Sequence, residues 1–184
     1  MRCTVTKNYL NNAKMNNQIA KVAQAMMEKN RGDIRRIEHS LKVYTWALQM
    51  GVSESIDENA LEILELTALL HDIGIHVAEK KYGHSTSQYQ ELEGPPVACE
   101  ILTTLGYAPE VIERVCFIIS KHHTFTAIDH IDFQLLVEAD FLVNSTEDQL
   151  SDNQIINFAK NVFKTDSGFN YLKLLFPLLD FREG

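Results

Sequence analysis

The sequence predicts an all-α fold in one domain, on the basis of three observations. Apolar residues recur at helical spacing along most of the 184 residues, as at Leu61, Leu64 and Ala68. Residues that favour helix ends separate these stretches. No segment shows the alternation of apolar and polar residues that is typical of a strand. A chain of this length buries roughly 70% of its unfolded surface, so a second core is not needed.

Helical spacing predicts eight helices, with one long loop over residues 74–93. The predicted helices cover residues 16–30, 33–50, 55–72, 95–105, 109–121, 131–144, 151–164 and 169–179. Helix starts are indicated by Asp33 as an N-cap, by the capping-box pairs Ser55–Glu58 and Ser151–Gln154, and by Pro95, Pro96 and Pro109. Gly32 and Gly51 indicate helix ends. The 74–93 loop has room for one short helical turn, and long loops inside a domain are often functional.

Charge and composition exclude several classes of partner. The net charge is −8 and the pI about 5.3, without a long basic run. Duplex nucleic acid and membrane surfaces both need a cationic face, so neither is expected as a partner. The N-terminus lacks the apolar core of a signal peptide, and the scattered Cys3, Cys99 and Cys116 form no disulfide or metal pattern. We therefore expect a cytoplasmic protein, in which residues 1–15 are a candidate for a disordered tail and residues 16–184 form the domain.

Polar side chains occupy positions at the end of one predicted helix where its spacing predicts core. His71 continues the apolar series of Leu61, Leu64 and Ala68 at i+10. Asp72 follows Ala68 by four residues. Both side chains are therefore expected to point toward the core.

The same pattern recurs on three other predicted helices. His122 and His123 each follow an apolar residue of the preceding helix by four positions. Asp140 lies inside the otherwise apolar segment LLVEADFLV, and His39 shares a helix face with Val43. Two carboxylates and several imidazoles are thus expected to point inward from four separate helices.

A shared cation is the economical explanation for these inward polar groups, because a buried unpaired carboxylate is expensive. Imidazole and carboxylate ligands suit one or two divalent ions such as iron, manganese, zinc, nickel or cobalt. The lack of clustered cysteines argues against a structural zinc site. Each feature alone has a simpler explanation. A lone inward histidine is usually a core residue, and the His122–His123 pair suits a helix C-terminus.

The order of these residues resembles the HD-domain metal-dependent phosphohydrolase superfamily, whose signature is H…HD…D on an all-helical domain. The signature maps onto His39, His71–Asp72 and Asp140. Supporting stretches are ALLHDIG at 68–74, EGPPVACEIL at 93–102, KHH at 121–123 and LLVEADFLVN at 135–144. The resemblance covers about residues 30–145 and implies an HD-domain helical bundle with a metal site in its core.

The resemblance also implies a set of metal ligands. His39, His71, Asp72 and Asp140 would bind the first ion. In a two-metal branch of the superfamily, Asp72 would bridge to a second ion held by His122 and, less securely, His123. Such members often carry a histidine where this chain has Glu93, which is therefore a candidate ligand, with His84 as an alternative.

The implied activity is hydrolysis of a small phosphate ester, such as a nucleotide or dinucleotide, by water that the metal activates. Asp72 would hold and bridge the ions, and Glu93, if it is not a ligand, would accept the proton of the water. Candidate contacts to the substrate are Arg35, His76, Lys80, Lys81, Tyr82 and Lys121. Both a monoesterase and a diester or pyrophosphate hydrolase fit, and the chain is expected to be a monomer or a homodimer.

Two other functions stay open from the sequence. One is a nucleotide-binding or sensing module that holds metal and ligand with little turnover. The other is a metal-dependent oxygenase, because some HD-type proteins with two irons cleave C–C or C–P bonds. The mixed histidine and carboxylate ligands permit the second function, but no residue pattern supports it.

Overall fold

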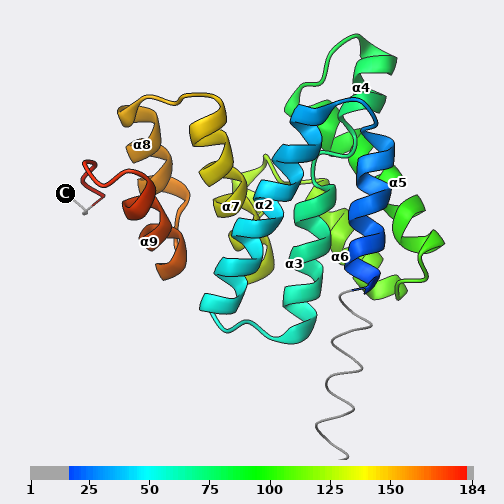
Figure 1. Cartoon of the computed structure of the whole chain (residues 1–184), viewed down its shortest axis with the longest axis horizontal. Helices are drawn as coiled ribbons and strands as arrows, with labels where there is room; N and C mark the ends of the chain where they lie inside the picture. Colours follow the sequence, from blue (N-terminus) through cyan, green and yellow to red (C-terminus); the bar gives the residue numbers. More distant parts are fainter. Residues whose placement is uncertain (1–16, 182–184) are drawn as a thin grey trace, which may run out of the picture.

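The computed structural model describes residues 17–181, and every regular element in this range is helical, which confirms the predicted all-α fold (Figure 1). A first helix over residues 17–29 precedes α2 (Ile34–Ser53), α3 (Glu58–Leu70), α4 (Ile75–Tyr82), α5 (Ser87–Thr104), α6 (Pro109–Ile119), the short 3-10 turn η1 (Phe125–Ala127), α7 (Ile131–Glu147), α8 (Asp152–Val162) and α9 (Asp166–Leu175). The predicted tail over residues 1–15 lies outside the described part of the chain.

Helix α3 lies at the centre of the bundle, where it packs against α2, α6 and α7. Every residue from Ile63 to Leu70 is buried, as expected for a helix surrounded on all sides. One hydrophobic core extends from Ile19 to Phe181. The C-terminal end of α3 therefore delivers the following His71 and Asp72 into the interior of the protein.

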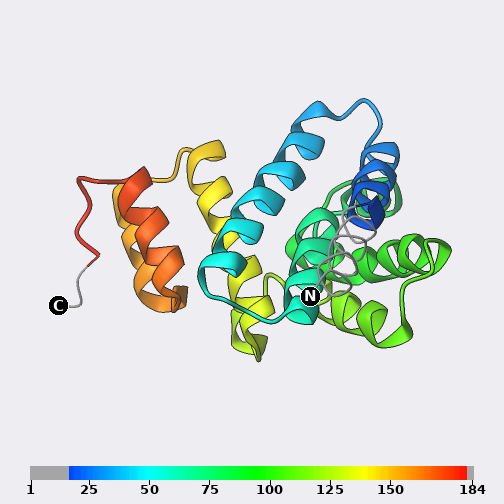
Figure 2. The ribbon, with the colours of Figure 1, turned by 60° about the horizontal axis from the view of Figure 1, so that its bottom comes forward.

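Helices α8 and α9 lie side by side at one edge of the bundle, beyond α7 (Figure 2). The buried carboxylate of Glu138 on α7 holds the turn between them, because its Oε1 accepts hydrogen bonds from the backbone N–H groups of Lys164 at 2.7 Å and Thr165 at 3.2 Å. The Thr165 hydroxyl and the Gln134 amide also donate to this carboxylate. Glu138 therefore connects the helix that carries Asp140 to the C-terminal helices.

Three of the predicted helix starts are confirmed. The Asp33 side chain accepts a hydrogen bond from Arg36 N at 3.2 Å and caps α2. Pro109 occupies the first turn of α6, where its missing N–H costs nothing. Ser151 and Gln154 form the predicted capping box of α8.

Two predictions about α2 and α3 are wrong. Gly51 does not end its helix, since α2 continues to Ser53. A Cβ atom at Gly51 would lie 2.7 Å from Leu61 Cδ1, so the glycine allows close packing of α2 on α3. The N-cap of α3 is Asp57 and not Ser55, because the Asp57 carboxylate accepts from Ala60 N at 2.9 Å.

The prediction of a loop over residues 74–93 is also wrong, because the region is mostly helical. It contains α4 and the first two turns of α5, separated by Gly83 in the left-handed conformation. Pro95 and Pro96 lie inside α5 and do not open it. Proline disfavours a helix interior because it lacks an N–H, so the sequence pattern placed the start too late.

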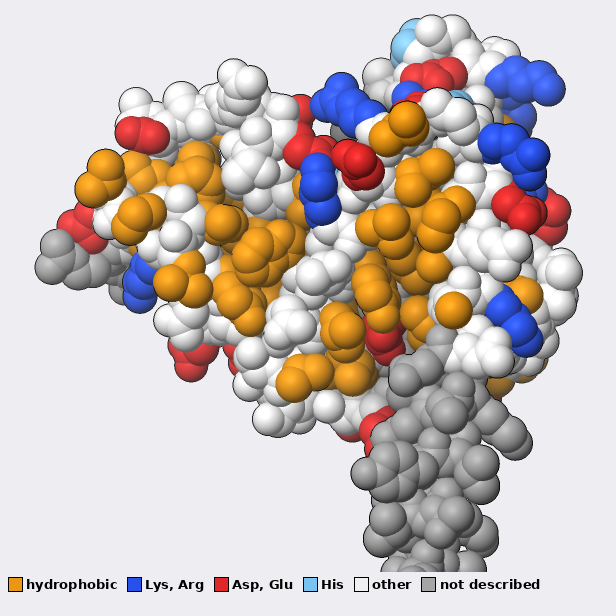
Figure 3. Space-filling model, viewed as in Figure 1, with side chains coloured by type: hydrophobic (Ala, Val, Ile, Leu, Met, Phe, Trp, Pro, Cys, Tyr) orange, Lys and Arg blue, Asp and Glu red, His pale blue; other side chains and the backbone are white. Residues whose placement is uncertain are grey.

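On the surface around α2, apolar and charged side chains occupy different regions. Figure 3 shows hydrophobic side chains along much of the face that α2 and its neighbours form, with charged side chains gathered at the end of α2 near α4. Arg36 and Glu79 form an ion pair of 2.6 Å at this end. Within residues 17–181, none of the helices is both long and apolar enough to span a membrane.

Candidate metal centre

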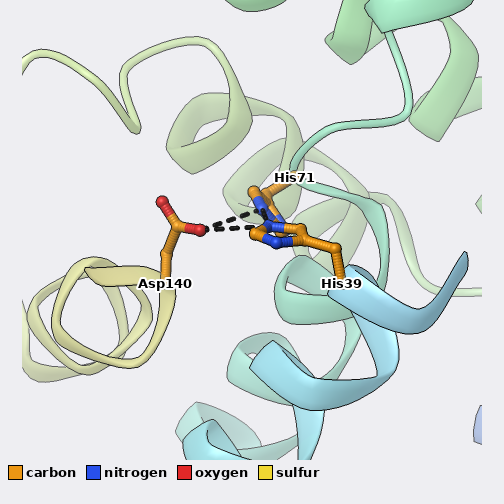
Figure 4. Close-up of side chains that lie close together, drawn as sticks. All are labelled: His39, His71 and Asp140. Carbon is orange, nitrogen blue, oxygen red and sulfur yellow. Dashed lines mark hydrogen bonds and ion pairs between the residues drawn. The ribbon is translucent and has the colours of Figure 1, made fainter. Parts of the chain in front are cut away.

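The first cluster brings together His39 from α2, His71 at the end of α3 and Asp140 from α7 (Figure 4). His39 Nε2 lies 3.2 Å from His71 Nε2 and 3.2 Å from Asp140 Oδ1. His71 Nε2 lies 3.5 Å from the same carboxylate oxygen. Both histidines are almost fully buried, so three elements distant in sequence converge on one interior point.

The second cluster consists of Asp72, His122 and His123, whose ligand atoms lie within 4.8 Å of one another. His122 follows α6 and is 3% exposed. Its Nε2 lies 3.6 Å from Asp72 Oδ1 and has no hydrogen-bond partner, although the atom is buried. A buried nitrogen without a partner indicates a site that a ligand would complete.

Asp72 connects the two clusters through its two oxygens. Oδ1 faces His122, whereas Oδ2 lies 3.7 Å from His39 Nε2 and 3.6 Å from His71 Nε2. One carboxylate oxygen is thus available on each side. This is the arrangement that a bridging ligand between two ions requires.

Hydrogen bonds at the outer ring nitrogens fix how the histidines point. His71 Nδ1 donates to Ala68 O at 3.0 Å, and His122 Nδ1 donates to Ile119 O at 2.7 Å. Because a carbonyl oxygen only accepts, each ring in its neutral form has its lone pair on Nε2, which faces the cluster. His39 Nδ1 has a carboxylate partner instead, Glu147 Oε2 at 3.0 Å.

The ring of His123 uses its other nitrogen for the supporting hydrogen bond. Its Nε2 donates to Gln90 Oε1 at 2.7 Å, which leaves Nδ1 as the lone-pair atom. Burial, together with the neighbouring His122, lowers the pKa of His123 to about 4. The ring is therefore neutral at physiological pH, as a metal ligand must be.

The carboxylates and imidazoles strongly perturb each other's pKa values. Burial disfavours the charged ring of His71, yet Asp72 and Asp140 raise its pKa to about 9. Burial likewise works against the charged carboxylates, but the facing histidines hold the pKa values of Asp72 and Asp140 well below the usual range. The two carboxylates thus remain ionised in the interior and attract positive charge to the point between the rings.

A cleft of about 380 Å³ opens onto the first cluster. His39 and Asp72 form part of its wall. The other residues that line it are Asp33, Arg35, Arg36, Ile75, Asn144, Glu147 and Asp148. The centre is therefore buried but reachable from this side.

Glu93, the candidate ligand of the second ion, has other partners in the structure. Its side chain lies outside both clusters, and its oxygens accept from Lys81 Nζ at 2.5 Å and Tyr82 Oη at 2.8 Å. These bonds hold the pKa of Glu93 below its ordinary value. The alternative ligand His84 is exposed and packs its ring near Tyr89.

The expected substrate contacts are divided between the cleft and other surfaces. Arg35 lines the cleft and pairs with Asp148 at 3.4 Å. His76 receives a hydrogen bond from Arg36 at 3.0 Å on the outer face of α4. Lys80 and Lys81 are exposed at the end of α4, Tyr82 stacks on Tyr89, and Lys121 is exposed just before His122.

The sequence analysis missed several residues of the cleft wall and one outside it. Arg36 precedes His39 by three residues, and Asn144 and Glu147 follow Asp140 by four and seven. These spacings place them on the same helix faces as the signature residues, so helical periodicity could have found them. Gln90, which binds His123, lies in the region that was predicted as a loop.

The donor set fits divalent metal ions. Imidazole nitrogens and carboxylate oxygens face each other in both clusters, and the unpartnered His122 Nε2 lacks only a ligand. The outer ring nitrogens already have the hydrogen bonds that metal-bound histidines require. A buried arrangement of this kind inside an all-helical bundle could hold one or two such ions.

The particular family follows from the sequence itself. The HD domain family model matches residues 36–167, and the chain belongs to that family, within the metal-dependent phosphohydrolase superfamily. The matched range includes every residue of both clusters. Neither a search of curated proteins nor a search of solved structures found a match.

Proposed function

We propose that this chain is a metal-dependent hydrolase of a small phosphate ester, with nucleotides and dinucleotides as the first substrates to test. The observation that carries the proposal is the position of Asp72, which offers one carboxylate oxygen to each of two histidine-containing clusters. Two-metal sites recur in enzymes that cleave phosphate esters. Most members of the HD family are metal-dependent hydrolases, which agrees with this assignment.

The ligands would divide between two ions. His39, His71 and Asp140 would hold the first ion with one oxygen of Asp72. His122, His123 and the other oxygen of Asp72 would hold the second. Bound divalent ions supply Lewis acidity, which lowers the pKa of a coordinated water and withdraws charge from phosphoryl oxygens. With one oxygen toward each cluster, Asp72 would orient and connect the ions and would not accept a proton.

Arg35 and Arg36 are the cations of the cleft wall and the best-placed groups to bind a phosphate. A guanidinium presents paired N–H donors that match phosphate oxygens. The Arg35 side chain is 76% exposed, and its ion pair with Asp148 has a long N–O distance of 3.4 Å. Arg35 is therefore available to a substrate. Four carboxylates also line the wall, so the phosphate would depend on the ions and these two arginines for positive charge.

The contacts expected from α4 are retained as a second set. Lys80, Lys81, Tyr82 and His76 belong to α4, and Lys121 precedes His122. These groups would contact the part of the substrate that extends beyond the cleft. Glu93 would act through Lys81 and Tyr82, which it holds, and not as a metal ligand.

The test combines metal content with turnover. Protein purified without chelator would be analysed for metals and assayed for phosphate release from nucleotides, dinucleotides and simple phosphate esters. We expect close to two ions per chain and metal-dependent release of phosphate. The variant His71→Ala should lose at least 100-fold in rate, whereas His130→Ala, which changes an exposed histidine, should retain the wild-type rate.

Other outcomes would redirect the assignment. Metal and nucleotide binding without phosphate release would support a sensing module. Loss of a substrate together with consumption of oxygen would support an oxygenase. No bound metal after reconstitution would contradict the hydrolase proposal.

A further inference from the structure

The ring of His39 lies between two carboxylates of the same helix. Its Nε2 is 3.2 Å from Asp140 Oδ1, and its Nδ1 is 3.0 Å from Glu147 Oε2. Asp140 and Glu147 are seven residues apart on α7, which is two helical turns and places them on one face. Each nitrogen of the ring therefore faces its own carboxylate.

The carboxylate of Glu147 is itself held in place. Lys42, one turn beyond His39 on α2, donates to Glu147 Oε1 at 2.8 Å, while Oε2 bonds to His39. The Glu147 side chain is only 16% exposed. With a different partner on each oxygen and little contact with water, this carboxylate has one favoured orientation.

Among the four histidines of the two clusters, His39 is the one with a charged group at its outer nitrogen. His71 and His122 donate to backbone carbonyls, and His123 donates to the amide of Gln90. A charged acceptor makes a stronger hydrogen bond than a neutral one and increases the basicity of the ring more. The first cluster thus has a supporting group that the second cluster lacks.

We propose that Glu147 is a positioning residue of the metal centre. It keeps the proton of His39 on Nδ1, aims Nε2 at the first cluster and thereby strengthens metal binding there. Lys42 restrains Glu147 from the other side. The inference rests on the proposed function only in requiring a metal ion at the first cluster, and it makes no use of the reaction.

Metal affinity is the direct test. Metal-free protein would be titrated with Zn²⁺ against a competing chelator for the wild type, Glu147→Ala, Glu147→Gln and Asp148→Asn. We expect a 10- to 100-fold loss of affinity at the first cluster in Glu147→Ala. Glu147→Gln should lose less, because its amide oxygen still accepts from His39 Nδ1. Asp148→Asn is the matched control, because Asp148 lines the same cleft and pairs with Arg35 but does not touch His39. Its Zn²⁺ affinity should therefore stay within about twofold of the wild type.

A spectroscopic readout separates positioning from general destabilisation. In the Zn²⁺-loaded wild type, we expect a slowly exchanging imidazole N–H resonance of His39 at low field, assigned by its absence in His39→Gln. The resonance should move upfield in Glu147→Gln and exchange rapidly in Glu147→Ala. Thermal unfolding of the metal-free proteins would show whether each variant is folded. If Glu147→Ala does not fold, a loss in Glu147→Gln of at least threefold relative to Asp148→Asn replaces it as the criterion.

The outcomes distinguish this inference from the proposed function. Wild-type affinity in Glu147→Ala, or an equal loss in Asp148→Asn, would overturn the role of Glu147 and leave the hydrolase proposal standing. The expected loss of affinity in a protein without phosphatase activity would support the role of Glu147 and count against hydrolysis. A wild type that binds no Zn²⁺ would overturn both.

Discussion

Asp72 is the residue on which the two clusters jointly depend, because its oxygens face opposite sides. His122, by comparison, belongs only to the second cluster. Removing either residue should therefore change the number of bound ions differently. This difference tests the geometry without a known substrate.

We expect His122→Ala to bind about one ion per chain and Asp72→Ala to bind less than one. The reason is that the first cluster keeps all its ligands in His122→Ala but loses one in Asp72→Ala. Elemental analysis after removal of free metal measures both. Equal stoichiometry in the two variants would contradict the bridging position of Asp72, and His130→Ala serves as the control.

A second prediction at this scale concerns the buried carboxyl of Glu65 on α3. Burial raises the pKa of Glu65 above its ordinary value, although the Tyr44 hydroxyl, which donates to it at 2.9 Å, acts in the opposite direction. A carboxyl with a raised pKa in the folded state favours the protonated form. Its contribution to stability is therefore complete at pH values below the unfolded pKa and is lost as pH rises through the folded pKa.

Replacing Glu65 with glutamine should accordingly stabilise the protein at neutral pH. The amide still accepts from Tyr44 and carries no charge that burial penalises. We expect the Tm of Glu65→Gln to exceed that of the wild type at pH 7.5, with the difference shrinking toward pH 4. Calorimetry at both pH values measures this, and Glu113→Gln, on the exposed face of α6, is the control. A constant difference across pH would contradict the assignment.

At the scale of elements, the turn that carries the HD residues fits against α5 because both backbones have a glycine there. A Cβ atom at Gly74 would lie 2.4 Å from Gly94 N and 2.8 Å from Glu93 C. Backbone atoms cannot move aside as a side chain can. The two backbones are therefore in direct contact, immediately before the prolines of α5.

Gly74→Ala should therefore be costly, by roughly 2 kcal/mol or more in the free energy of unfolding. Gly51→Ala is a suitable comparison, because the nearest atom there is the flexible end of Leu61 and alanine gains about 1 kcal/mol in helix propensity. Denaturant unfolding of both variants gives the difference. Similar stabilities for the two would show that the turn and α5 can separate easily.

The junction of α7 with the C-terminal helices depends on one buried side chain, Glu138. In Glu138→Ala, the backbone N–H groups of Lys164 and Thr165 would lose their acceptor. We expect a loss of roughly 2–4 kcal/mol, because buried donors without partners are expensive. Glu138→Gln keeps one acceptor oxygen and should lose less. Denaturant unfolding measures both, and a neutral Glu138→Ala would mean that solvent replaces the carboxylate.

For the whole molecule, the first cluster connects α2, α3 and α7, which surround the core. Metal bound there stabilises the folded state by mass action, by about 2.7 kcal/mol at a ligand concentration 100 times Kd. Chelation should then lower Tm by roughly 5–10 °C in a chain of this size. Calorimetry with and without chelator measures the shift, which Asp72→Ala should largely lack. An unchanged wild-type Tm would argue against metal at this cluster.

Much of this architecture could be predicted because buried helix faces produce a periodic pattern of apolar residues in the sequence. Asp33, Pro109 and the Ser151–Gln154 pair act through atoms a few residues away, so their positions were correct. Other predictions failed. Gly51 lies inside α2, where it leaves room for Leu61 of the next helix, a contact that the local pattern does not reveal.

The sequence by itself determined the helical class, the family and the inward direction of the signature residues, because spacing along a helix fixes the face that each side chain occupies. Only the tertiary structure decided which of those residues meet. In the folded chain, the two oxygens of Asp72 face different clusters. Glu93 accepts hydrogen bonds from Lys81 and Tyr82, and Glu147 contacts the outer nitrogen of His39. Such contacts depend on how helices cross, and the crossing is set by packing over the whole core.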